Sequence, residues 1–137
     1  MADFRRTDDI ATCLMIRRVV FIEGQNVPED LEVDGEDHLC RHYLGVVEGN
    51  AVATARVKPL GCQAKIQRVA VLEDLCSKGI GTDLMRFILS DLAGEFEEAV
   101  LGSQTHAIGF YARLGFEAFG PEYDDAGIPH RDMRRTL

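Results

Sequence analysis

One stretch limits the possible folds more than any other: an apolar run that passes through a glycine turn into an amphipathic helix. The run KIQRVAVL (65–72) has a nearly continuous apolar end, which is typical of a strand buried on both faces. From Gly79 to Leu92, apolar residues recur at helical spacing. A second apolar run, EAVLGS (98–103), follows. This order predicts two locally parallel strands joined by a helix.

The rest of the chain predicts strands that pair mostly antiparallel. Two runs flank Gly49-Asn50, which indicates a β-hairpin. Asp8 or Asp9 can cap the first helix, and Thr105 can cap the last one. The predicted strands are 3–7, 42–48, 51–58, 65–72, 98–103, 116–120 and 130–137, and the predicted helices are 10 to about 24, 79–92 and 106–114. We therefore expect one mixed α/β (α+β) domain over 1–137, with a central, twisted, mostly antiparallel sheet.

Composition excludes several classes of function. The chain has 137 residues, of which 46% are hydrophobic, enough for one domain with a core. A net charge of −8 argues against a nucleic-acid partner and favours a small cationic substrate. No apolar stretch approaches the roughly 20 residues of a membrane helix, and the charged start MADFRRTDDI is unlike a signal peptide. We expect a cytoplasmic protein with no membrane partner.

The four cysteines of the chain form no C-x-x-C pair, so we expect free thiols.

The segment 23–37 is unusual because seven of its fifteen residues are acidic and none is basic. Gly24, Pro28 and Gly35 interrupt it, which predicts a long loop with at most a short helical turn. A structureless loop of that length is uncommon in a compact domain and is often functional. A solvated surface loop is the equally weighted alternative.

The glycine turn at Gly79 and Gly81 indicates an anion site. The first turn of a helix leaves backbone N–H groups without partners, and the helix dipole adds positive charge there. Glycines remove the β-carbons that would block a ligand, and Lys78 and Thr82 add a charge and a hydroxyl. The P-loop pattern is absent, and Leu84 stands where a dinucleotide fingerprint needs its third glycine. A nucleotide-binding domain remains an alternative.

Two longer stretches resemble the GNAT family of N-acetyltransferases over essentially the whole chain. RVAVLEDLCSKGIGTDLM (68–85) is similar to the family's acetyl-CoA pyrophosphate loop, [RQ]-x-x-G-x-[GA], and SQTHAIGFYARLGFEAFG (103–120) to its A-x-x-F-Y-x-x-x-G-F signature. The segments 20–37, 68–71 and 127–133 resemble the ElaA-like branch in particular. One position departs from the family pattern, because Cys76 stands where the loop motif has Arg or Gln. A reactive Cys76 thiol and an inert one are both open.

The resemblance implies direct transfer of an acetyl group from acetyl-CoA to a primary amine of a small acceptor. It implies Tyr111 as the general acid that protonates the leaving thiolate. A half-buried core aromatic is the alternative for Tyr111. The residues implied to bind acetyl-CoA are Val69, Ala70, Val71, Ser77, Lys78, Gly79, Ile80, Gly81, Thr82, Gln104, Ala107, Phe110 and Tyr111. A non-catalytic acyl-CoA-binding or regulatory module on the same fold is the rival interpretation.

The acceptor side is open in the sequence. Glu23 or His130 is the candidate base or acceptor contact, and Glu23, Asp34 and His38 are candidate substrate contacts. Each has a surface or structural role as its alternative. His38, Cys40 and His42 share an H-x-C-x-H pattern, but no second ligand pair accompanies it, so we expect no metal. A homodimer is possible, although no residue pattern indicates an interface.

Overall fold

The computed structural model describes residues 2–73, 75 and 79–137. Its elements in chain order are β1 (Ala2–Thr7), α1 (Ile10–Arg17), the π-helical η1 (Arg18–Glu23), α2 (Glu29–Glu32), the 3-10 turn η2 (Asp37–Leu39), β2 (Arg41–Val47), β3 (Asn50–Leu60), β4 (Gln63–Val71), α3 (Ile80–Leu92), β5 (Glu98–Gln104), the 3-10 turn η4 (Thr105–Ala107), α4 (Ile108–Ala112), β6 (Glu117–Asp125) and β7 (Ile128–Thr136). In this described part the strands form one seven-stranded sheet in the order β1-β2-β3-β4-β5-β7-β6. The predicted α/β fold is confirmed.

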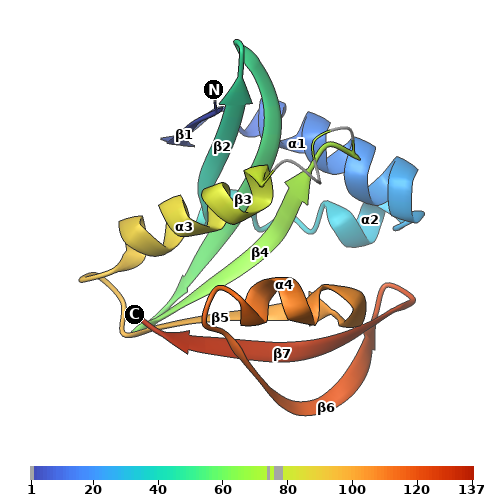
Figure 1. The fold of residues 1–137 in the computed structure, drawn as a ribbon. Coiled ribbons are helices and arrows are strands. Elements are labelled where there is room, and N and C mark those ends of the chain that lie inside the picture. The colour runs from blue at the N-terminus through green and yellow to red at the C-terminus, as the bar shows by residue number, and fades with distance from the viewer. Residues whose placement is uncertain (1, 74, 76–78) are drawn as a thin grey trace.

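The sheet has one parallel step, between β4 and β5, and this step opens into a V (Figure 1). The register pairs are Gln63 with Glu98, Ala64 with Ala99 and Lys65 with Val100. Beyond these pairs the two strands diverge, although β4 continues to Val71 and β5 to Gln104. All other neighbouring strands pair antiparallel. The fold is therefore two antiparallel half-sheets joined along a short parallel seam.

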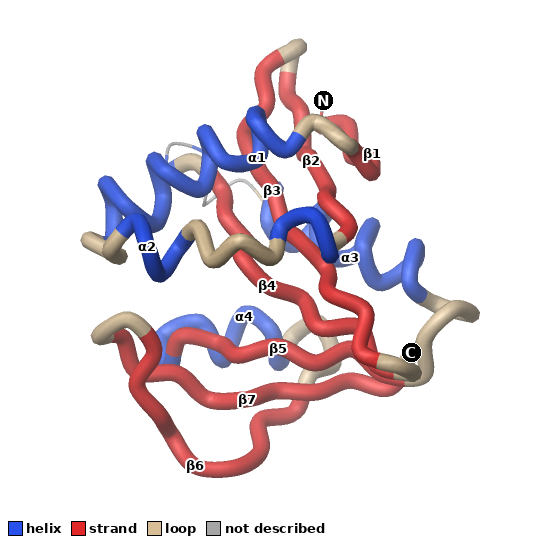
Figure 2. The backbone as a smooth tube through the Cα atoms, turned by 180° about the vertical axis from the view of Figure 1, so that it is seen from behind, coloured by secondary structure: helices blue, strands red, loops and turns tan. Residues whose placement is uncertain are grey.

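Helices cover both faces of the sheet. In Figure 1, α3 and α4 lie in front, whereas Figure 2 shows α1 and α2 in front when the molecule is seen from behind. The apolar stripe of α3, which includes Leu84, Ile88 and Leu92, is buried in the larger core cluster. On the other face, Cys13 and Ile16 of α1 pack in a second, smaller cluster. Each face of the sheet is thus covered by the apolar side of a helix, α3 on one face and α1 on the other.

Of the three β-hairpins in the described part, two turn through two consecutive residues with positive φ, whereas the β3–β4 turn has a positive φ only at Gly61 (64°). The two pairs are Glu48 and Gly49 (51° and 81°) between β2 and β3, and Ala126 and Gly127 (54° and 82°) between β6 and β7. Positive φ at both central residues matches the twist of hairpin strands, as in type I′ turns. The predicted turn at Gly49-Asn50 is one residue too late, because Asn50 already pairs with Val47.

The C-terminal hairpin is longer than predicted. The strands expected at 116–120 and 130–137 are Glu117–Asp125 and Ile128–Thr136, because the polar segment between them continues the pairing up to a tight turn. Asp9 caps α1 by accepting a hydrogen bond from the Thr12 amide. Thr105 does not cap a helix as predicted, since it opens the 3-10 turn that precedes α4.

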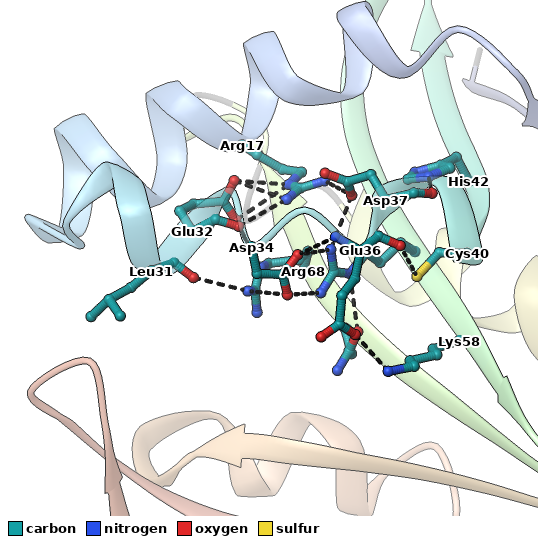
Figure 3. Close-up of polar contacts among 12 residues, drawn as sticks. Arg17, Leu31, Glu32, Asp34, Glu36, Asp37, Cys40, His42, Lys58 and Arg68 are labelled. Carbon is teal, nitrogen blue, oxygen red and sulfur yellow. Dashed lines mark hydrogen bonds and ion pairs between the residues drawn. The ribbon is translucent and has the colours of Figure 1, made fainter.

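Ion pairs between three arginines and three carboxylates fix the position of the acidic segment, and Figure 3 shows these contacts around Arg17 and Arg68. We call this cluster the arginine network; its members are Arg17, Arg56, Arg68, Glu32, Asp34 and Asp37. Arg17 of α1 lies 3.0 Å from Glu32 and 2.6 Å from Asp37. Arg56 of β3 reaches Asp34 at 2.7 Å and Asp37 at 3.0 Å. The predicted long loop therefore contains α2 and η2, and five of its seven carboxylates are ion-paired.

The network is largely shielded from water, so its pairing matters for stability. The side chains of Arg17 and Glu32 are 1% and 2% exposed. Hydrogen bonds from Arg56 hold the pKa of Asp34 below its ordinary value. Burial raises the pKa of Asp37, but hydrogen bonds from Arg17 and Arg56 outweigh it and the net pKa is lowered. Since the unfolded chain then binds these protons more readily, stability is lost as the pH falls below about 4.

Replacement of Arg17 tests this arrangement. Arg17→Met leaves Glu32 and Asp37 with one arginine fewer each inside the fold, and breaking a buried ion pair costs about 3–5 kcal/mol. We expect urea denaturation to show a loss at the lower end of that range, because Arg68 and Arg56 remain. Arg18→Met is the matched control, since Arg18 is exposed and pairs with exposed Glu29, and it should cost less than about 1 kcal/mol. Equal losses for the two variants would contradict a structural role for the network.

Candidate active site

A cleft of about 420 Å³ lies between the diverging ends of β4 and β5. One wall comes from β4, with Val69, Ala70 and Val71, and the opposite wall comes from β5 and α4. In both views the β6–β7 turn and α2 lie on opposite sides of the gap between β4 and β5 (Figures 1 and 2), and residues of both line the cleft. The splay of the two strands thus creates a binding space in the middle of the sheet, where polar backbone and apolar side chains are both available.

The N-terminal end of α3 borders this cleft. Gly79 has a φ of 77°, a left-handed conformation that favours glycine, and it precedes the first helical residue. Gly81 lines the cleft, and a β-carbon there would lie 3.4 Å from Phe110 Cζ and 3.5 Å from Val71 Cγ2. Any larger side chain would fill the space. Ile80 is buried in the core, so only its backbone is available to a ligand.

Two of the predicted loop contacts cannot be placed. Ser77 and Lys78, together with Cys76, lie outside the described residues. Thr82 is half-buried in the first turn of α3 and does not line the cleft.

Tyr111 lies on α4 and lines the cleft. Its ring packs edge-on against Phe110 and Phe116, with ring centroids 5.0 and 6.0 Å away. Burial raises the pKa of Tyr111 to about 12. The hydroxyl therefore stays protonated at neutral pH and is available as a donor.

Gln104 ends β5 and makes a polar bridge across the cleft. Its amide nitrogen donates to Gln25 Oε1 at 2.8 Å, and its Oε1 lies 2.6 Å from His106 Nε2. Gln25 comes from the segment after η1, on the other side of the V. Sequence reasoning missed Gln25, because a contact between residues 79 positions apart leaves no local pattern.

His130 lines the cleft from β7, beside the turn of the last hairpin. Its Nδ1 lies 2.7 Å from the carbonyl oxygen of Ile128. A carbonyl oxygen only accepts, so in the neutral ring Nδ1 carries the hydrogen and Nε2 carries the lone pair. Tyr123 stacks on the imidazole at 5.9 Å and donates its hydroxyl proton to Asp132 at 2.7 Å. This arrangement fixes the orientation of the ring, and in the neutral ring the second nitrogen carries the lone pair.

The other predicted acceptor-side residues lie elsewhere. Glu23 is exposed at the end of η1, Asp34 belongs to the arginine network, and His38 is exposed on η2; none of them lines the cleft. His42 Nε2 bonds the Asp37 carbonyl at 2.8 Å. Within the described residues, no group of three His, Cys, Asp or Glu side chains could hold a metal ion.

The cleft also has a wall that sequence reasoning missed. Val20 and Phe21 of η1, Val27 and Leu31 line it on the side of the acidic segment. Asp125 lines it from the turn of the last hairpin. For Val27 and Leu31 the available signal was the presence of apolar residues within an otherwise acidic stretch.

Comparison with known proteins agrees with this geometry. The family model described as an acetyltransferase (GNAT) domain matches residues 24–137. YyaT of Bacillus subtilis (strain 168) is 38% identical over 137 aligned residues, covering 94% of this chain and 90% of YyaT. ElaA of Escherichia coli (strain K12) is 33% identical over 131 aligned residues, covering 90% of this chain and 85% of ElaA.

Solved structures agree as well. The crystal structure of Escherichia coli ElaA superposes with a TM-score of 0.86 at 29% identity, and covers 98% of this chain and 99% of that one. An acyl-CoA N-acyltransferase from Pseudomonas aeruginosa superposes with a TM-score of 0.89 at 28% identity, with the same coverage. In the described part of this chain, no helix is long and apolar enough to span a membrane. The chain belongs to the GNAT family of acetyltransferases, in its ElaA-like branch.

Proposed function

We propose that the protein transfers an acetyl group directly from acetyl-CoA to a primary amine. The observation that supports this is the cleft between the splayed strands β4 and β5, which has Tyr111 and His130 on its lining. Membership of the GNAT family and the similarity to an acyl-CoA N-acyltransferase support an acyl-CoA donor.

The donor side of the cleft fits a narrow ligand with an anionic group. The β4 backbone beyond Lys65 is separated from β5, so it faces the cleft, and Gly81 leaves room at its end. The first-turn amides of the 13-residue helix α3 suit a pyrophosphate. The residues that we propose to contact acetyl-CoA are Val69, Ala70, Val71, Ser77, Lys78, Gly79, Ile80, Gly81, Thr82, Gln104, Ala107, Phe110 and Tyr111.

Acetyl transfer needs a base and an acid at the two ends of the reacting group. Acetyl-CoA supplies the acetyl group as a thioester; a C–N bond forms, the C–S bond breaks, the amine nitrogen loses a proton and the sulfur gains one. We assign proton removal from the amine to His130 Nε2, which carries the lone pair. We assign proton donation to the sulfur to the Tyr111 hydroxyl, which is protonated at neutral pH. Glu23, the other candidate base, lies outside the cleft lining.

Binding of the donor can be tested by thermal unfolding. Acetyl-CoA or CoA at about 100 times its dissociation constant should add about 2.7 kcal/mol, which for a chain of this size raises Tm by about 9 °C. ATP and NAD should raise it far less. Gly81→Val should remove the shift by filling the cleft between Phe110 and Val71. Gly109→Val is the control, because Gly109 does not line the cleft. A larger shift with ATP or NAD would point to a nucleotide-binding domain.

The role of Tyr111 can be tested by removing its hydroxyl. Tyr111→Phe should lower kcat about 100-fold, within the range of a general acid, while the shift in Tm with CoA persists. Tyr43→Phe is the control, since it also removes a tyrosine hydroxyl, but one bonded to Asp91 and outside the cleft lining; it should keep its rate. An unchanged kcat in Tyr111→Phe would refute the general-acid assignment. CoA binding without any transfer by the unsubstituted protein would favour the non-catalytic module.

The two candidate bases predict opposite results. His130→Gln should lower kcat/KM about 100-fold near pH 7, and the deficit should shrink as the pH rises and more of the amine is already unprotonated. Glu23→Gln should stay within about twofold of the unsubstituted enzyme, because its side chain is exposed and outside the cleft lining. Steady-state rates over a pH series measure both. A larger loss in Glu23→Gln would reverse the assignment.

A further inference from the structure

The charge of the acidic segment is largely neutralised within the fold. Its six carboxylates between 29 and 37 face five described cations, and five of the six are ion-paired; the pairs are Glu29 with Arg18, Glu32 with Arg17 and Arg68, Asp34 with Arg56 and Arg68, Glu36 with Lys58, and Asp37 with Arg17 and Arg56. Of these carboxylates only Glu32 lines the cleft, and its side chain is 2% exposed. The segment therefore shapes the acceptor side but does not present a row of free carboxylates to a cation.

What this side presents to the cleft is an apolar surface. Val20 and Phe21 pack onto the smaller core cluster with one side and line the cleft with the other. Val27 and Leu31 extend the surface. Leu31 is the one apolar residue of α2, and it is 51% exposed. We call these four residues the apolar wall. When a ligand covers apolar surface in an open cleft, water leaves that surface and binding becomes more favourable.

The free charges of the lining lie at opposite ends of the cleft. Among the described residues, Lys65 and Asp125 line the cleft without an ion pair. Lys65 lies at the closed end, where β4 still pairs with β5, and Asp125 lies at the turn of the last hairpin. His130 is on the same hairpin, opposite Tyr123. An ammonium group that pairs with Asp125 would therefore lie near His130, the proposed base.

We infer that the acceptor is an amphipathic primary monoamine, with an alkyl or arylalkyl body against the apolar wall and one ammonium group beside Asp125. This inference rests on the proposed function. A second ammonium group on the body would lie against Val20, Phe21, Val27 and Leu31, without a carboxylate to replace its water. Polyamines and amino sugars, which carry charge or hydroxyls along the body, are therefore poor acceptors.

A series of matched amines tests this. From propylamine to heptylamine, kcat/KM with acetyl-CoA should rise about fourfold per methylene, the value expected for covering apolar surface. The compound 1,6-diaminohexane has as many non-hydrogen atoms as heptylamine but ends in a second ammonium group. We expect heptylamine to exceed it by at least 50-fold in kcat/KM.

Two leucines of similar exposure provide the variant and its control. Leu31→Asp should flatten the methylene series and reduce the preference for heptylamine over the diamine at least tenfold. Leu39 is 53% exposed on η2 and does not line the cleft, so Leu39→Asp should leave the series unchanged. The Tm shift with CoA should be the same in both variants, which separates loss of acceptor binding from loss of donor binding.

The possible outcomes separate this inference from the proposed function. A flat series, or preference for the diamine, with acetyl transfer intact would overturn the inference and leave the transferase standing. Stabilisation by CoA without acetylation of any amine in the series would overturn the inference and favour the non-catalytic module. If CoA does not stabilise the protein and no amine is acetylated, the proposed function itself is overturned.

Discussion

The site depends on a constraint in the sheet: β4 and β5 pair over three residues and then separate. Parallel strands normally satisfy each other's backbone groups along their full length. Here β4 runs on to Val71 and β5 to Gln104 beyond their last pair, so the middle of the sheet contains a gap lined by backbone and apolar side chains. The antiparallel partners β3 and β7 hold each strand on its outer side, which lets the inner sides diverge without unravelling the sheet.

The arginine network supports one side of that gap. Burying an arginine costs desolvation free energy unless its charge is paired, and here Arg17 and Arg56 each bridge two carboxylates. Arg68 joins the same network from a β-bulge in β4, where its φ of 55° departs from normal strand geometry. The network thereby ties the acidic segment to α1, β3 and β4. A segment whose carboxylates would otherwise repel one another is thereby held in one position beside the cleft, and only Glu32 of those between 29 and 37 lines it.

The two sides of the cleft have different physical characters. The proposed donor side is built from α3, α4 and the β4 backbone, where Gly81 leaves space and the N-terminus of α3 favours an anion. The proposed acceptor side is built from η1, α2 and the last hairpin, where apolar side chains face His130 and Asp125. The Gln25–Gln104 bridge connects the two sides at one point. Such a division lets the acceptor specificity vary without changing the donor machinery.

The sequence alone determined the strand–glycine–helix step, the order of the elements and the family signature around Tyr111, because these rest on local periodicity, turn chemistry and short spacings. It also identified His130 as one of two candidate bases. Tertiary structure decided what depends on distant contacts. Only the fold shows that Glu23, Asp34 and His38 do not line the cleft, that His130 is oriented by Ile128, and that Gln25 meets Gln104. Only the fold shows that the acidic segment is neutralised, since Arg17, Arg56 and Arg68 are far from its carboxylates in sequence and reach them only when α1, β3 and β4 come together.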